Sequence, residues 1–125
     1  MNIDEAVSNL VLELRRGTLI LLVLSQLREP MYGYHLVKKL NDSEIPMDAN
    51  TLYPLMRRLE NQGLLQSKWD TEEAKPRKYY EITPEGQSVL ERATDYWKQF
   101  SKKVDMMLEG EHDRGSDRTL YLRCN

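Results

Sequence analysis

Hydrophobic positions near the start of the chain fall at helical spacing. From Ile3 to Leu14 they recur three and four residues apart, which predicts an amphipathic helix with one apolar side. Arg15-Arg16-Gly17 interrupts the pattern, and Thr18 is a suitable N-cap for a second helix from Leu19 to about Arg28. This second helix is apolar on nearly all sides. We therefore expect two helices here, the second of them central to the core.

Two shorter helices are predicted next, separated by a polar turn. The first runs from about Tyr32 to Leu40, and the second from about Ala49 to Asn61. The second has apolar residues at i, i+3, i+4 and i+7, which predicts a buried stripe: Leu52, Leu55, Met56 and Leu59. Proline disrupts a helix interior, so we expect Asn50 or Thr51 to be the N-cap, which places Pro54 in the first turn.

The remaining pattern predicts a β-ribbon and one long helix. Leu64 to Trp69 and Lys78 to Ile82 each contain β-branched or aromatic residues, and a polar loop joins them. Thr83-Pro84-Glu85 is a strong helix start, and the helix should run to about Leu108. At about 1.5 Å per residue it spans roughly 37 Å, too long to be covered by so small a domain.

The order of these elements predicts a mainly α fold with a small β-ribbon, a winged helix-turn-helix. Residues 1–83 would hold the N-terminal helix and the winged helix-turn-helix, and residues 84–108 a long C-terminal dimerisation helix. Residues 109–125 would form a charged, mobile tail. Two short helices joined by a turn, with a polar and basic face on the second, are typical of helix-turn-helix DNA-binding domains.

Composition narrows the class of protein. The 125 residues suit one domain, and 40% hydrophobic with 30% charged residues is typical of soluble proteins. No apolar run is long enough to span a membrane, and Asp4 and Glu5 stand where a signal peptide would carry lysines. One cysteine, Cys124, excludes an internal disulfide. We expect a cytoplasmic protein, nucleoid-associated when bound to DNA, with no metal and no cofactor.

Net charge argues mildly against nucleic-acid binding, because the chain carries −2 with a pI of about 5.7. The basic residues are nevertheless clustered, at Lys38–Lys39, Arg57–Arg58 and Lys75–Lys78, and a locally basic surface still attracts phosphate. No catalytic motif is recognisable, so an enzyme is not expected. The acidity leaves open an alternative: a winged-helix module that binds a protein partner and no DNA.

Candidate DNA contacts lie on the second helix of the motif, at the start of the first, and in the wing. Small polar residues allow close approach to the edges of the DNA bases, and arginines reach guanines or phosphates. The basic side chains of the wing would contact the DNA backbone. Each residue has a plain alternative as a solvated or packing side chain. Strand alternation places Arg77 and Lys78 on opposite faces. The candidate DNA-binding residues are Tyr32, Asn50, Thr51, Tyr53, Arg57, Arg58, Lys75, Arg77 and Lys78.

Several runs of the sequence resemble the PadR family of transcription regulators. The matching runs are Arg16-Gly17-Thr18-Leu19, Met31-Tyr32-Gly33-Tyr34, Thr51 through Leu64, Lys78-Tyr79-Tyr80 and Thr83-Pro84-Glu85-Gly86. The single long C-terminal helix is similar to the shorter of the family's two architectures. The resemblance implies a sequence-specific regulator of operator DNA, a repressor released by a small molecule or a stress signal.

The resemblance also implies a homodimer formed by the first and last helices, which would read an inverted repeat with half-sites about one helical turn apart. The candidate dimerisation residues are Val7, Leu10, Leu14, Leu90, Trp97, Val104 and Leu108. Trp97 has two interpretations. It packs in the dimer interface, or, as in some multidrug-binding relatives, it stacks with its symmetry mate on a planar aromatic effector, with Phe100 lining the same space.

Overall fold

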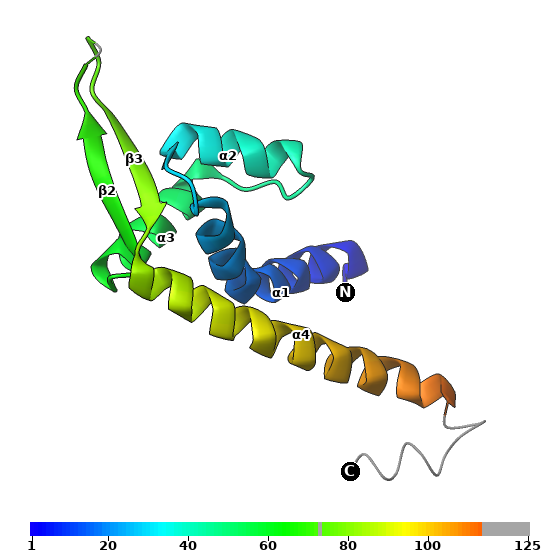
Figure 1. Ribbon diagram of the computed structural model, residues 1–125. Coiled ribbons are helices and arrows are strands. Elements are labelled where there is room, and N and C mark those ends of the chain that lie inside the picture. The colour runs from blue at the N-terminus through cyan, green and yellow to red at the C-terminus, as the bar shows by residue number, and fades with distance from the viewer. Residues whose placement is uncertain (73, 114–125) are drawn as a thin grey trace. The chain divides into compact units, whose positions relative to one another are not determined.

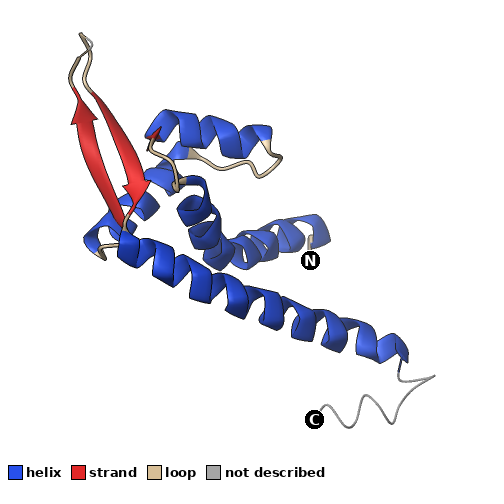
Figure 2. Cartoon of the chain, viewed as in Figure 1, coloured by secondary structure: helices blue, strands red, loops and turns tan. Residues whose placement is uncertain are grey.

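The computed structural model describes residues 1–72 and 74–113. Residues 1–91 form one compact unit, and a second unit begins at Arg92, within the last helix. Figures 1 and 2 show four helices and a small sheet over this part of the chain. In chain order the elements are α1 (Ile3–Gln26), β1 (Met31–Tyr32), α2 (Gly33–Asp42), α3 (Ala49–Asn61), β2 (Leu65–Asp70), β3 (Arg77–Ile82) and α4 (Pro84–Asp113).

The N-terminal segment forms one helix, so the prediction of two was wrong. α1 is continuous through Gly17, and Thr18 is an interior residue whose hydroxyl donates to the Arg15 carbonyl at 3.0 Å. The cap is Asn2, whose side chain accepts from the Glu5 amide. A helical glycine costs only about 1 kcal/mol, less than the loss of a continuous helix. The helix changes direction about halfway along (Figure 1), as hydroxyl bonds to the preceding turn often cause.

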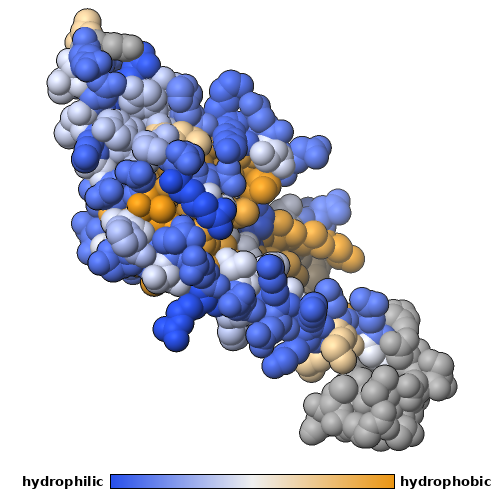
Figure 3. All heavy atoms as spheres, in the orientation of Figure 1, coloured by the Kyte–Doolittle hydropathy of each residue, from blue (hydrophilic) through white to orange (hydrophobic). Residues whose placement is uncertain are grey.

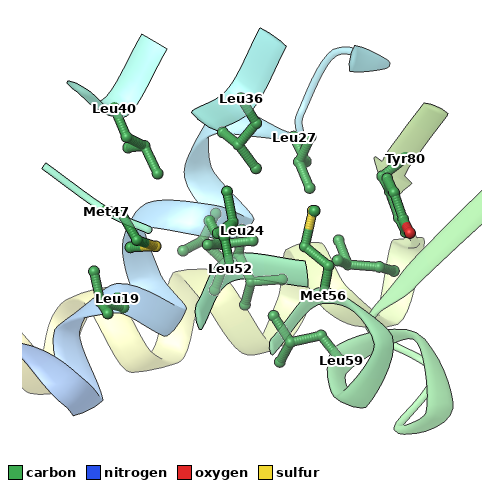
Figure 4. Close-up of a cluster of buried hydrophobic side chains, with 13 residues drawn as sticks. Leu19, Leu24, Leu27, Leu36, Leu40, Met47, Leu52, Met56, Leu59 and Tyr80 are labelled. Carbon is green, nitrogen blue, oxygen red and sulfur yellow. The ribbon is translucent and has the colours of Figure 1, made fainter. Parts of the chain in front are cut away.

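The core is built around the C-terminal half of α1, as expected for an all-round apolar helix. Val23, Leu24 and Leu27 are fully buried there. α2, α3 and both wing strands supply the side chains that surround them (Figure 4), among them Leu36, Leu40, Leu52, Met56, Leu59, Leu65 and Tyr80. At roughly 1.5–3 kcal/mol for each large buried side chain, this cluster holds the helices and sheet together.

The linker between α2 and α3 is fixed by hydrogen bonds. The Asn41 side-chain amide donates to the carbonyls of Val37 (2.8 Å) and Met47 (3.3 Å), and its oxygen accepts from the Met47 amide (3.1 Å). Arg15 of α1 donates to the Pro46 carbonyl. Glu44 turns the chain with a φ of 62°, a conformation that is unusual for a residue other than glycine. These contacts set the point at which α3 begins.

α3 has the predicted bounds, but its cap was predicted wrongly. Asp48 is the N-cap, and its carboxylate accepts from the Asn50 amide at 2.9 Å. Pro54 therefore lies in the second turn and not in the first, as an interior proline. It cannot donate to the Asn50 carbonyl one turn earlier. At the other end Gly63, with a φ of 81°, terminates the helix as expected.

The sheet has three strands, one more than predicted. β3 pairs antiparallel with both β1 and β2, in the order β1-β3-β2. β1 was missed because two residues are too few to show an alternating pattern. β2 and β3 form the predicted wing, which projects from the helices (Figure 2). Within it, Asp70 lies opposite Arg77 and Trp69 opposite Lys78.

α4 starts as predicted and ends later. The Thr83 hydroxyl caps it by accepting from the Gly86 amide at 2.9 Å. The helix continues to Asp113, five residues beyond the predicted Leu108, so residues 109–113 are helical and not part of a tail. The rest of the predicted tail, residues 114–125, lies outside the described residues. Within the described residues no helix combines the length and the apolar character needed to cross a membrane.

The position of Pro54 leads to a stability prediction. Pro54→Ala restores a donor for the Asn50 carbonyl and removes a steric clash, so it should raise the free energy of unfolding by about 1–3 kcal/mol. Urea denaturation measures this. Pro76→Ala, in the wing loop, is the matched control and should be neutral or slightly destabilising. Equal effects of the two substitutions would contradict an interior cost at Pro54.

Candidate nucleic-acid interface

One side of α3 is exposed and carries polar and basic side chains. Leu52, Met56 and Leu59 are buried on the opposite side, as the periodicity predicted, whereas Leu55, the fourth residue of the predicted stripe, is only half-buried against the same core. Because residues three, four and seven positions apart share a helix face, the exposed residues form one surface. We call it the recognition face, and its exposed members are Asn50, Thr51, Pro54, Arg57 and Arg58.

Tyr53, also predicted to contact DNA, is half-buried. Its ring lies against Gly33 at the start of α2, so closely that a Cβ on Gly33 would stand 2.5 Å from the ring. Burial, and secondarily the nearby Tyr80, raises the pKa of the Tyr53 hydroxyl. Tyr53 thus packs α2 against α3 at the border of the recognition face.

Tyr32 lies in β1 immediately before α2, next to the wing. Its hydroxyl donates to a carboxylate oxygen of Asp70, at the end of β2, at 2.5 Å. Its ring stacks on Tyr34, with centroids 5.7 Å apart and an interplanar angle of 8°. Tyr32, one of the predicted DNA-binding residues, therefore has its hydroxyl engaged with an acidic side chain in this structure.

The two basic residues that open β3 point to opposite faces, as strand alternation predicted. Arg77 donates to the Tyr34 hydroxyl at 2.7 Å, and its guanidinium lies 5.4 Å from the Tyr34 ring centroid and 5.9 Å from that of Tyr32. Lys78 is half-buried on the other face, 3.8 Å from the Glu60 carboxylate of α3. Each therefore joins the wing to a different helix of the motif.

The Glu60 carboxylate makes a second contact with the wing. It accepts from the Ser67 hydroxyl of β2 at 2.5 Å. The Lys78 ammonium also lies over the Tyr80 and Trp69 rings, at 5.5 and 5.9 Å from their centroids. Lys75, by contrast, is exposed in the wing loop beyond the strands. Hydrophilic side chains dominate the wing surface visible in Figure 3.

Asp70 is the acidic residue that contacts Tyr32 and lies opposite Arg77 in the wing. The Tyr32 hydroxyl, the Glu72 amide at 3.1 Å and the charge of Arg77, in that order, lower the pKa of its carboxyl below the ordinary value for an aspartate. A lowered carboxyl pKa stabilises the folded contact above the unfolded pKa, and this contribution is lost as pH falls through the folded value. The stabilisation that comes from the ionised Asp70 carboxylate is therefore present at neutral pH and is lost in acid.

The predicted dimerisation residues are mostly exposed. In the N-terminal half of α1, Val7, Leu10 and Leu14 are 52%, 58% and 67% exposed. On α4, Trp97, Phe100 and Leu108 are exposed and Val104 is half-buried. Leu90 differs, because it is 1% exposed and packs in the core of its own chain. No group of metal ligands is present among the residues that the structure describes.

Sequence reasoning missed three side chains next to the wing: Tyr34, Glu60 and Asp70. Their partners are 43, 18 and 38 residues away in the chain, at Arg77, Lys78 and Tyr32. Only the register that places Asp70 opposite Arg77 could have indicated part of this arrangement.

These features define a class of domain. An exposed polar and basic helix, preceded by a helix and a turn and flanked by a projecting β-hairpin, is a winged helix-turn-helix, the predicted fold. The chain belongs to the transcriptional regulator PadR-like family, whose model matches residues 20–92. The family consists of DNA-binding transcriptional regulators and not of enzymes, as the sequence predicted.

Solved structures agree with this assignment. A PadR family transcriptional regulator from Eggerthella lenta is 60% identical, with a TM-score of 0.83 over 87% of this chain and 97% of that chain. A transcriptional regulator from Clostridium thermocellum is 31% identical (TM-score 0.68, 74% and 95% covered). A PadR-like transcriptional regulator from Bacillus cereus is 29% identical (TM-score 0.68, 77% and 96% covered). No curated protein sequence matches this chain.

Proposed function

We propose that this regulator represses transcription by binding an operator as a homodimer, and that a small molecule or a stress signal releases it. The observation that carries the proposal is the recognition face of α3, which exposes Asn50, Thr51, Arg57 and Arg58 beside the wing. A repressor of this kind acts in the cytoplasm. Its operator would be an inverted repeat, because a two-fold dimer presents two copies of the same helix.

The chemistry of the recognition face suits the major groove. The small side chains of Asn50 and Thr51 let the start of α3 approach base edges, and Asn pairs with adenine. Arg57 and Arg58, about two turns later, extend to guanines or to phosphates. Tyr53 contributes from the border of this face. The wing supplies positive charge for the adjacent DNA backbone from Lys75, Arg77 and Lys78, and Tyr32 lies beside it, paired with Tyr79 of β3.

The dimer is proposed from exposed apolar side chains. Ile3, Val7, Leu10, Leu12 and Leu14 are all at least 52% exposed on α1, and on α4 Met106, Met107 and Leu108 exceed 55%. A soluble monomer rarely leaves so many large apolar residues on two helices in contact with water. A second copy of the same chain would cover these faces, as in an obligate homodimer. Leu90 is left out of the proposed interface because it is already buried.

The effector site is proposed at Trp97. Its ring is 42% exposed, and Phe100, three residues later, stacks on Tyr96 with centroids 5.5 Å apart. Aromatic side chains three and four residues apart share a helix face, and a two-fold dimer would bring two such faces together. Flat rings stack well on planar aromatic molecules. A planar aromatic effector held between the two Trp97 rings would couple ligand binding to the geometry of the dimer.

Removing the two recognition arginines tests DNA binding. The double variant Arg57→Ala, Arg58→Ala should lose at least about tenfold in affinity for the protein's own promoter fragment, since each arginine makes a charge-assisted contact. A gel shift measures this. Lys102→Ala with Lys103→Ala on α4 removes the same charge elsewhere and should bind as the unaltered protein does. Equal binding by a folded arginine variant would contradict the proposal.

Light scattering tests the dimer. The chain of 14.8 kDa should have twice this mass in solution at micromolar concentration. Leu10→Glu places a charge in the proposed interface and should give monomers, whereas Glu13→Gln, on the same helix, should not. A monomeric unaltered protein, or a dimer unaffected by Leu10→Glu, would count against an α1 interface.

Tryptophan fluorescence tests the effector site. Trp69 and Trp97 are the two tryptophans of the chain, so Trp69→Phe leaves Trp97 as the one tryptophan that emits when tryptophan is excited selectively. Proflavine, a planar aromatic probe, should quench Trp97 saturably at micromolar concentration and should leave Trp69 little affected in a Trp97→Phe variant. Equal quenching of both tryptophans would indicate collision in solution and would refute the site.

A further inference from the structure

We infer that Asp70, together with Tyr32 and Tyr34, is a positioning residue that holds the wing at a fixed angle to the helix-turn-helix, so that DNA binding depends on an acidic side chain next to the interface. The inference rests on the proposed operator binding. It assigns these residues a role through other residues and not through contact with DNA.

The wing is anchored on both faces near the ends of its strands. On one face the Tyr32 hydroxyl donates to Asp70 at 2.5 Å, and Arg77, opposite Asp70 in the ribbon, donates to the Tyr34 hydroxyl at 2.7 Å. Both contacts lead to the start of α2. On the other face Ser67 and Lys78 contact Glu60 of α3. A ribbon held on one face can pivot, whereas one held on both is fixed in two directions.

The aromatic rings stiffen the anchor towards α2. Tyr32 and Tyr34 stack within 8° of parallel, His35 lies 4.2 Å from the Tyr34 ring centroid, and Arg77 lies over both tyrosine rings. This ring packing restricts the rotamers of Tyr32 and Tyr34, whose hydroxyl groups make the two hydrogen bonds. The hydrogen bonds to Asp70 and Arg77 therefore connect groups that are already ordered.

The anchor on Asp70 and Arg77 acts at the far end of the paired strands, next to the loop. Six residues at about 3.3 Å each give a strand of about 20 Å, so without this anchor a tilt of about 10° at the core end would move the end that carries Asp70 by about 3.5 Å. That displacement exceeds the tolerance of a hydrogen bond to a phosphate. A wing fixed before binding also avoids the loss of conformational entropy on the DNA.

Coulomb's law and anchoring make opposite predictions for Asp70. If the carboxylate acted only through its charge, it would repel phosphate, and its removal would strengthen DNA binding. Direct phosphate contact by Tyr32 predicts the same direction, because the hydroxyl would be released. If Asp70 holds the wing, its removal weakens binding. The sign of the change therefore decides between these roles.

The experiment compares Asp70→Ala with Glu72→Ala in the full-length protein. Both substitutions remove one acid from the same wing, but Asp70 accepts the Tyr32 hydrogen bond and Glu72 contacts Asp70 only through its main chain. Asp70→Ala should weaken promoter binding by about threefold to tenfold, the cost of ordering one or two side chains on binding. Glu72→Ala should leave it unchanged or strengthen it. Affinity for Asp70→Ala equal to or above that for Glu72→Ala overturns the inference.

A second readout needs no DNA. Backbone hydrogen exchange across β2 and β3 should be faster in Asp70→Ala and Tyr32→Phe than in Glu72→Ala, and unchanged exchange overturns the inference. Tyr32→Phe should also raise the pKa of the Asp70 carboxyl in a titration followed by NMR, since it removes the main cause of the lowered value. Combining Tyr32→Phe with Asp70→Ala should add little further loss, because both remove one bond.

The two proposals fail separately. If the unaltered protein does not retain its promoter fragment, the proposed function is wrong, and hydrogen exchange still decides whether Asp70 and Tyr32 hold the wing. If the protein binds but the Asp70→Ala variant behaves as Glu72→Ala does, the operator proposal stands and the positioning role is wrong. Circular dichroism checks that each variant is folded, and all three altered side chains lie outside the buried core.

Discussion

The packing of the second half of α1 against α2, α3 and the wing strands is the interaction on which the rest of this domain depends. Leu24 and Leu27 are completely excluded from water, and every other element of the first unit supplies side chains around them. α3 can present one polar side only because the other is fixed on this cluster. A loss of packing here would change the direction of the recognition face before it changed any residue on it.

The wing obeys a second constraint, since it has almost no core of its own. A two-stranded ribbon is marginally stable in water, so its direction has to come from contacts with neighbouring elements. The structure supplies them through the pairing of β3 with β1, through Leu65 and Tyr80 in the core, and through polar side chains: Asp70 and Arg77 towards α2, and Ser67 and Lys78 towards α3. Residues that sequence reasoning assigned to phosphate thus also hold the protein together, and one guanidinium with five donors can serve both purposes.

The sequence predicted the elements with strong periodicity and failed where one local signal had to be weighed against packing. The bounds of α3 and most of its buried stripe followed from residue spacing and Gly63, and the start of α4 followed from Thr83-Pro84-Glu85. Gly17 and Thr18 carried the signal of a helix break, but the packing of the following turns outweighed it. Asp48 was overlooked as the cap because Asn50 and Thr51 offered an easier explanation of Pro54. The contacts of Tyr34 and Glu60 join residues far apart in the chain and left no local signal.

The placement of the wing anchors has a consequence for how such regulators diversify. Asp70 and Arg77 close the paired part of the ribbon, and the residues between them form the loop beyond the anchors. Insertions, deletions and charge changes in that loop leave the register of the strands and their contacts with α2 and α3 in place. The length and charge of the wing loop can therefore change separately from the direction of the wing. Two paralogues could share this scaffold and differ in how they contact the DNA backbone.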